Sequence, residues 1–161
     1  MATKGNSELT KGIPQLKDAF VIIVKTDWNA HIVDVLQAGC EKALAENEVR
    51  YTTVTVPGAF EIHFIIRRLH ENGAKADAYV ALGSVVRGDT PHFDYVCKGV
   101  TDGIVHLNST LDVPVIFGIL TVDNEQQAVE RIGGIHGHKG EEAATTAIKM
   151  IALNRNAANI K

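Results

Sequence analysis

Residues 19–24 read Ala-Phe-Val-Ile-Ile-Val, a continuous apolar and β-branched run that decides the fold class. Such a run is typical of a parallel strand whose two faces are both covered by helices. The residues after it change to a helical period, with apolar side chains at spacings of three and four from Ile32 to Leu44. Together they predict the first strand–helix unit of an α/β protein.

The same alternation occurs three more times along the chain. Further strands are expected at residues 51–56, 78–86 and 113–120, and helices at 60–70 and 91–107. Two helices are expected after the fourth strand. Four strands, each followed by a helix, predict a four-stranded parallel sheet with right-handed crossovers.

The first 18 residues lack this alternation and carry Gly5, Gly12 and Pro14. No internal repeat and no long linker divides the rest of the chain. We therefore expect an N-terminal arm at residues 1–18 and a single α/β domain at residues 19–161.

Composition excludes several classes of protein. The chain has 161 residues, 45% of them hydrophobic and 22% charged, which is typical of a soluble globular protein. A net charge of −3 argues against a nucleic-acid-binding face, and no apolar run is long enough to span a membrane. The N-terminus has no apolar stretch typical of a secretory signal, and Cys40 and Cys97 lie far apart. Reduced thiols in the cytoplasm are expected.

In a parallel sheet, ligands bind beyond the carboxyl ends of the strands. Four polar and aromatic segments follow the predicted strands and are therefore the expected site, namely residues 26–29, 56–61, 84–92 and 117–123.

The segment 84–92 carries the strongest chemical signal. Thr90 can cap the next helix, Pro91 fits its first position, and His92 then falls in the first turn. Free backbone N–H groups and the helix dipole at that point favour a phosphate, and a neutral His92 could relay a proton. Gly88 allows close approach of a ligand to the backbone. A solvent-facing histidine with no function is the alternative.

The other candidates are ambiguous alone. Trp28 could stack on a planar heterocycle or pack in the core. Glu61 could bind ligand N–H groups or complement a helix dipole. Arg131 could hold a phosphate in a bidentate pair or be a solvated charge. His136 and His138 have no evident third metal ligand, so we expect no metal site.

Three common motifs are missing. The sequence lacks the G-x-x-x-x-G-K-[ST] loop, a G-x-G-x-x-G between strand and helix, and the G-x-S-x-G elbow. A P-loop NTPase, a dinucleotide-binding unit and a serine hydrolase are therefore not expected. Cys97 lies between Val96 and Val100 in a predicted helix, which favours a buried thiol over a nucleophile.

Taken together, five segments resemble the lumazine synthase family from about Phe20 to Ile151. They are Trp28-Asn29, VPGAFE (56–61), GSVVRGDTPHFDYV (83–96), PVIFGILT (114–121), and ERIGG (130–134) with HKGEEAA (138–144). The resemblance implies a three-layer, flavodoxin-like sandwich. It also implies condensation of 5-amino-6-(D-ribitylamino)uracil with 3,4-dihydroxy-2-butanone 4-phosphate, the penultimate step of riboflavin biosynthesis, without metal or organic cofactor.

The resemblance also assigns roles to individual residues. It makes His92 the proton-transfer residue and Trp28 the ring that stacks on the pyrimidine, where most members have phenylalanine. Phosphate binding is assigned to Asp89, Thr90 and Arg131. The other uracil and ribityl contacts are assigned to Ala59, Phe60, Glu61, Ser84, Val85, Val86 and, from an adjacent subunit, Phe117. Ile135 stands where many members have lysine, which places more of the phosphate binding on Arg131.

Assembly follows from the same resemblance. It implies a cyclic pentamer in which the arm extends a neighbour's sheet. A short glycine-rich turn at residues 133–140 is typical of members that close twelve pentamers into an icosahedral capsid, with riboflavin synthase as a partner. Two alternative functions remain open: a non-catalytic flavin or pterin carrier, and a purely structural shell protein.

Overall fold

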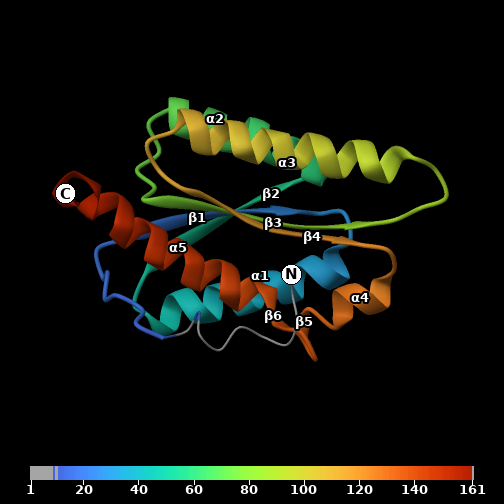
Figure 1. The fold of residues 1–161 in the computed structure, drawn as a ribbon, viewed down its shortest axis with the longest axis horizontal. Coiled ribbons are helices and arrows are strands. Elements are labelled where there is room, and N and C mark those ends of the chain that lie inside the picture. Colours follow the sequence, from blue (N-terminus) through green and yellow to red (C-terminus); the bar gives the residue numbers. More distant parts are fainter. Residues whose placement is uncertain (1–8, 10, 161) are drawn as a thin grey trace.

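A computed structural model describes residues 9 and 11–160 of the chain and contains the predicted parallel sheet. The strand order is β2-β1-β3-β4, and every neighbouring pair is parallel (Figure 1). The strands are β1 (Phe20–Thr26), β2 (Arg50–Val56), β3 (Ala78–Val86) and β4 (Val115–Val122). The α/β class and the four-stranded sheet are thereby confirmed.

Helices cover both faces of this sheet. One face packs against α1 (Ala30–Glu46) and α5 (Lys139–Asn156), and the other against α2 (Ile62–Glu71) and α3 (His92–Thr110) (Figure 1). The result is the expected three-layer sandwich. Three short helices complete the helical structure of the described residues: η1 (Ala59–Glu61), α4 (Glu125–Val129) and η2 (Ala157–Asn159).

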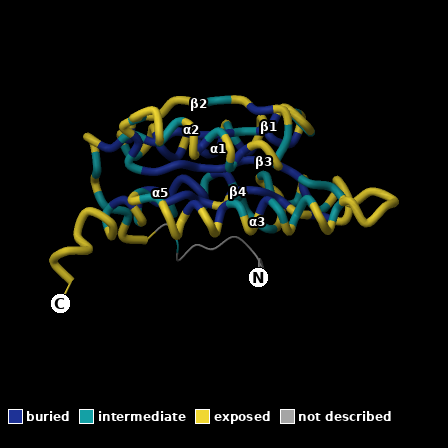
Figure 2. The backbone as a smooth tube through the Cα atoms, turned by 90° about the horizontal axis from the view of Figure 1, so that it is seen from above, coloured by how far each residue is buried: buried dark blue, intermediate teal, exposed yellow. Residues whose placement is uncertain are grey.

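The hydrophobic core consists of two clusters, one on each face of the sheet, and alternate residues of a strand belong to different clusters. Val21 and Ile23 of β1 belong to the cluster under α1 and α5, whereas Ile22 and Val24 belong to the cluster under α2 and α3. Successive side chains of a strand point to opposite faces, so a strand buried on both faces must be apolar throughout. The buried strands lie in the middle of the molecule, and β2 at one edge is largely exposed (Figure 2).

Several element boundaries differ from the prediction, and one pair of strands was not predicted. The fourth strand runs over Val115–Val122 instead of 113–120, because its pairing with β3 starts where Val115 lies opposite Tyr79. Helix α3 begins at His92, one residue later than expected. The glycine-rich segment after α4 contains a small antiparallel hairpin, β5 (Ile132–Gly134) with β6 (Gly137–His138).

The end of the predicted arm lies against the domain. Ile13 and Leu16 are partly buried against the cluster under α1 and α5. Asp18 accepts two hydrogen bonds from Arg155 of α5, at 3.0 and 3.1 Å. Half of the predicted arm, residues 1–8 and 10, lies outside the described residues, so the predicted pairing of the arm with a neighbour's sheet lies partly outside them.

The chain connections place a crevice at one end of the sheet. Strands β1 and β3 are neighbours, yet the helices that follow them, α1 and α3, lie on opposite faces. Such a reversal opens a crevice beyond the carboxyl ends of the two strands, where ligands of open α/β sheets bind.

Candidate functional site

A pocket of about 620 Å³ lies in this crevice. Loops after β1, β2 and β3 and the first turns of α3 surround it, so it gathers residues far apart in sequence. The lining residues are Thr26, Trp28, Asn29, Gly58, Ala59, Phe60, Glu61, Ser84, Val85, Val86, Gly88, Thr90, His92, Phe93, Tyr95 and Val96.

The loop after β1 presents an exposed indole ring. Trp28 is 74% exposed, which decides against the core-packing alternative. Its backbone is fixed from two sides, because its carbonyl accepts from the Thr26 hydroxyl at 3.0 Å and its amide donates to the Pro57 carbonyl at 3.0 Å. Asn29 follows in the left-handed region and donates its side-chain amide to the Ser84 carbonyl at 2.9 Å. The indole is thereby held at the mouth of the pocket.

The loop after β2 contributes a second aromatic ring. Phe60 is 52% exposed, lies in η1 and lines the pocket. Its ring packs against Gly99 of α3, where an added Cβ would be only 2.6 Å from a ring carbon, and edge-on against His63 at 5.8 Å between ring centroids. Glu61 follows in the first turn and is exposed, and its carboxylate is available to a ligand in the pocket.

The end of β3 supplies a buried hydroxyl that lacks a partner. Ser84 is 4% exposed and lines the pocket, and its Oγ has no hydrogen-bond partner among the described residues. Buried polar groups in native proteins are nearly always hydrogen-bonded, so an unsatisfied one in a pocket wall indicates a place for a polar ligand group. Val85 and Val86 continue the wall as half-buried apolar side chains.

A tight turn then leads into α3. The hydroxyl of Thr90 accepts a hydrogen bond from the amide of His92 at 3.4 Å, a long form of the predicted cap. His92 is the first residue of the helix and is exposed toward the pocket. The amide of Asp94 donates to the Pro91 carbonyl at 3.0 Å, and the helix dipole at this end makes the place favourable for an anion.

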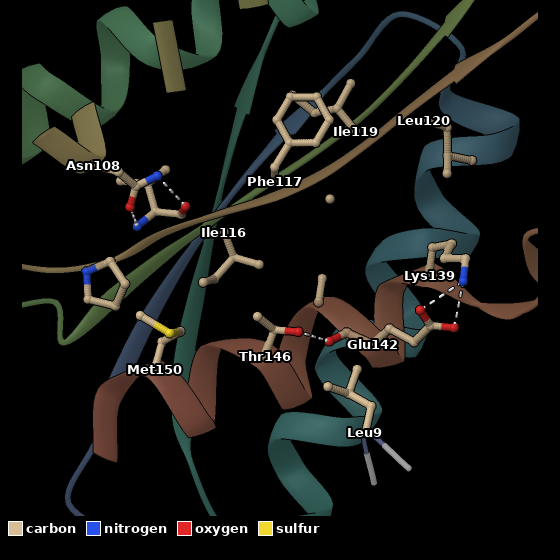
Figure 3. Close-up of a pocket in the computed structure, with 14 residues that line it drawn as sticks. Leu9, Asn108, Ile116, Phe117, Ile119, Leu120, Lys139, Glu142, Thr146 and Met150 are labelled. Atoms are coloured by element: carbon tan, nitrogen blue, oxygen red, sulfur yellow. Dashed lines mark hydrogen bonds and ion pairs between the residues drawn. The ribbon is translucent and has the colours of Figure 1, made fainter. Parts of the chain in front are cut away.

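Three of the predicted residues do not line this pocket. Asp89 is exposed beside it. Phe117 is 41% exposed on β4 and lines a separate groove of about 520 Å³ between β4, α3 and α5 (Figure 3). Arg131 lies just after α4, where its guanidinium donates to the carbonyl of Gln127 at 2.7 Å. One chain thus assembles nine of the twelve predicted residues.

Six lining residues were given no role from the sequence, namely Thr26, Asn29, Gly58, Phe93, Tyr95 and Val96. Tyr95 and Val96 follow His92 at helical spacings of three and four, so the same face of α3 carries all three. Helical spacing from His92 was therefore the signal that could have found them. Asn29 gave no such signal, because its role depends on a contact with Ser84, 55 residues away.

The remaining candidate groups lie elsewhere. Burial raises the pKa of the Cys40 thiol to about 12, and it also raises that of Cys97. The ring of His138 packs against Gly39, and His136 lies 3.8 Å from a Glu130 carboxylate. Among residues 9 and 11–160 no three histidine, cysteine or acidic side chains form a group that could hold a metal. No helix of this described part is long and apolar enough to cross a bilayer.

Comparison with known proteins places this pocket in a family. The family model for 6,7-dimethyl-8-ribityllumazine synthase matches residues 18–155, which include every lining residue. The chain belongs to this family. A lumazine synthase from Parabacteroides distasonis is 47% identical over 142 residues, 86% of this chain and 88% of the relative. One from Christiangramia forsetii is 44% identical over 163 residues, 98% of this chain and 97% of the relative.

Membership of the lumazine synthase family makes the chain an enzyme, a transferase of this type, with a flavodoxin-like fold. Of the two other classes left open by the sequence, the flavin carrier does not account for a histidine beside an anion-favouring helix start, because riboflavin has no phosphate to bind. The family and the pocket therefore point to the same chemistry.

Proposed function

We propose that the chain condenses 5-amino-6-(D-ribitylamino)uracil with 3,4-dihydroxy-2-butanone 4-phosphate to give 6,7-dimethyl-8-ribityllumazine, phosphate and water. The observation that carries the proposal is the pocket itself. It places an exposed indole, a phosphate-favouring turn and His92 around one space. Each of the two substrates thus has a matching half of the site.

The uracil binds in the half formed by the loops after β1 and β2. Trp28 stacks on the pyrimidine ring, because an exposed indole face is well suited to a planar heterocycle. The backbone of Ser84, Val85 and Val86 binds the ring edge, and the free Ser84 hydroxyl offers a further donor. Ala59, Phe60 and Glu61 hold the ribityl chain and the rest of the ring.

The phosphate of the second substrate binds at the start of α3. The amides of Asp89 and Thr90, the Thr90 hydroxyl and the helix dipole supply the attraction. The exposed carboxylate of Asp89 stays outside the pocket, so that only its amide faces the anion. Arg131 adds a guanidinium fork, which matches phosphate oxygens in a bidentate pair.

The reaction depends mainly on holding the two substrates together. The uracil's 5-amino group attacks the ketone carbon, and loss of water gives an imine. Elimination of phosphate then gives an enol, which becomes a ketone. The ribitylamino nitrogen attacks this new carbonyl, and loss of a second water completes the ring. His92 lies beside both halves of the pocket and transfers protons in these steps, whereas proximity lowers the barrier by several kcal/mol or more. None of these steps requires a metal or an organic cofactor.

Phe117 and Arg131 act in the pocket of a neighbouring subunit. Both lie outside the pocket of their own chain, and Phe117 is exposed on the edge strand of the described sheet. A ring-shaped pentamer brings these residues of one copy to the pocket of the next. The arm, residues 1–18, extends the neighbour's sheet beside the domain of residues 19–161, since an unpaired strand edge favours such pairing.

The larger assembly is a capsid of twelve pentamers in the cytoplasm. The hairpin β5–β6 is short, which leaves room for contacts between pentamers. Riboflavin synthase, which uses the lumazine product, is the proposed partner. Nucleic acid and membranes are not proposed as partners.

One experiment tests the reaction against the carrier and the shell protein. The protein is mixed with both substrates, and lumazine absorbance and phosphate release are followed together. Equal amounts of both products identify the synthase. Binding of flavin without phosphate release would favour the carrier, and neither binding nor turnover would favour the shell protein.

A further inference from the structure

Arg87 lies between β3 and the turn that leads into α3, and it does not line the pocket. Its side chain nevertheless makes three contacts. Nε donates to Asp123 Oδ1 at 2.9 Å, and Nη1 donates to Asp94 Oδ1 at 3.2 Å. The guanidinium also lies over the ring of Phe93, 4.1 Å from its centroid.

These contacts join three segments around the proposed phosphate turn. Phe93 and Asp94 belong to the first turn of α3, directly after His92, and Asp123 follows the end of β4. The backbone amide of Arg87 also donates to the carbonyl of Val122 at 2.9 Å. Residues 88–91 therefore lie between Arg87 and the two residues of α3 that its side chain contacts, Phe93 and Asp94.

The same contacts continue to Arg131. The amide of Asp123 donates to the side-chain carbonyl of Gln127 at 2.9 Å, and the backbone carbonyl of Gln127 accepts from Arg131 at 2.7 Å. One connected set of hydrogen bonds thus joins the turn before α3, which belongs to this chain's own pocket, to Arg131, which is proposed to act in the neighbour's pocket.

Charge gives Arg87 a second effect on this turn. Asp94 and Asp123 would repel a phosphate bound near the first turn of α3, and the guanidinium pairs with both carboxylates. The hydrogen bond to Asp123 and the charge of Asp94 raise the pKa of Arg87, so the group stays charged.

We propose that Arg87 is a positioning residue for the phosphate half of the site, fixing the turn at residues 88–90 and the start of α3 while pairing with Asp94 and Asp123. This inference rests on the proposed function, because the phosphate it concerns is that of the butanone substrate. Arg87 acts through the turn and does not touch the substrate.

The test compares Arg87→Gln with Arg67→Gln. Arg67 is a matched control, because its guanidinium pairs with Glu71 at 2.9 Å, lies 5.9 Å from the Phe64 ring centroid, and is similarly exposed. The measurements are KM for each substrate, kcat, and the rise in Tm caused by inorganic phosphate.

Arg87→Gln is expected to raise KM for the butanone phosphate by about tenfold to a hundredfold, the size of effect that small misplacements produce. KM for the uracil should stay within about twofold, and the phosphate-induced rise in Tm should be lost. Arg87→Lys keeps the positive charge but lacks the planar guanidinium. Its KM for the butanone phosphate should lie between those of the wild type and Arg87→Gln. Arg67→Gln should match the wild type in all four measurements.

An Arg87→Gln protein that only melts at a lower temperature, with both KM values and the phosphate effect unchanged, would overturn the proposal. So would equal increases in both KM values.

If Arg87→Gln does not fold, Arg87→Lys decides the question, because it keeps the charge but cannot hold Asp94, Asp123 and the Phe93 ring with one planar group. It should still raise KM for the butanone phosphate, and no change in that KM overturns the proposal. A wild type that phosphate stabilises but that forms no lumazine would overturn the proposed function, while loss of that stabilisation in Arg87→Gln would still support the role of Arg87 in binding phosphate.

Discussion

At the scale of single residues, the site depends on where each side chain is held more than on unusual side-chain chemistry. Trp28 is an ordinary indole, but two backbone hydrogen bonds fix its loop at the pocket mouth. His92 is exposed at the helix start beside the turn that favours an anion. We propose that holding the two substrates together supplies most of the rate, so loss of one proton-transfer group should weaken catalysis without ending it.

The variant His92→Ala tests how much of the rate comes from proton transfer and how much from positioning of the substrates. The expected result is a fall in kcat of about 10²–10⁴-fold, the usual contribution of a general acid–base group, with KM values little changed. Steady-state kinetics with both substrates measure it, and the circular dichroism spectrum controls for folding. Complete loss of turnover in a folded protein that still binds both substrates would contradict it.

Arg131→Lys tests the assignment of the phosphate ligand. Lysine keeps the positive charge but cannot present two parallel N–H groups to phosphate oxygens. KM for the butanone phosphate should therefore rise by about tenfold or more, while KM for the uracil changes little. Equal changes in the two KM values would argue that Arg131 has a general structural role.

Cys40 offers a prediction about reactivity. Burial raises its pKa to about 12, so at pH 8 only about one thiol in 10⁴ is ionised and available to attack a disulfide reagent. The folded protein should show no rapid reaction of Cys40 with such a reagent, and unfolding in denaturant should expose it. Mass spectrometry of the labelled peptides identifies which cysteine reacted. Rapid labelling of Cys40 in the folded protein would contradict its burial at the α1–α5 contact.

At the scale of elements, two glycines of α3 pack against aromatic rings from the segment that contains η1 and α2. Phe60 packs on Gly99, and His63 packs on Gly103 one helical turn later. A Cβ at either position would come within 3.0 Å of a ring atom. The approach of these two elements therefore sets where the Phe60 ring lies in the pocket.

Gly99→Ala should displace the Phe60 ring. We expect a destabilisation of about 1–3 kcal/mol from overpacking and a severalfold higher KM for the uracil. Val105→Ala on the same helix is the control, since that side chain is 59% exposed. In a Phe60→Ala background the clash is gone, and Gly99→Ala should then be neutral or slightly stabilising, because alanine favours helix more than glycine. A Gly99→Ala effect that persists in that background would rule out the ring as its cause.

The sequence predicted those elements whose patterns are local. The apolar runs of β1 and β3 and the periodic helices are visible in any short window, and the parallel sheet follows from the helix after each strand. The strand order β2-β1-β3-β4 was not predicted and comes from the structure. The hairpin β5–β6 was missed because its residues are mostly glycine and histidine and carry no period of two. The contact of Asn29 with Ser84 depends on tertiary packing, which local patterns do not encode.

At the scale of the whole molecule, two residues expected in the site and one edge of the sheet are not used within a single described chain. Phe117 and Arg131 lie away from the pocket to which the family resemblance assigns them. The β4 edge is unpaired in the described sheet and borders a groove with α3 and α5 (Figure 3). An exposed strand edge of this kind is normally covered in a native assembly. Activity should therefore require association of several copies.

The mass of the assembly tests this last step. Five chains of 17.4 kDa weigh about 87 kDa and sixty about 1,040 kDa, and closed symmetry is the rule for soluble homo-oligomers. We expect the larger species at near-neutral pH, because the hairpin between α4 and α5 is short. Analytical ultracentrifugation in phosphate and in Tris buffer separates the two masses, and activity is assayed on each species. A single species near 87 kDa would contradict the capsid and leave the pentameric enzyme intact, whereas an active monomer would contradict the shared site as well.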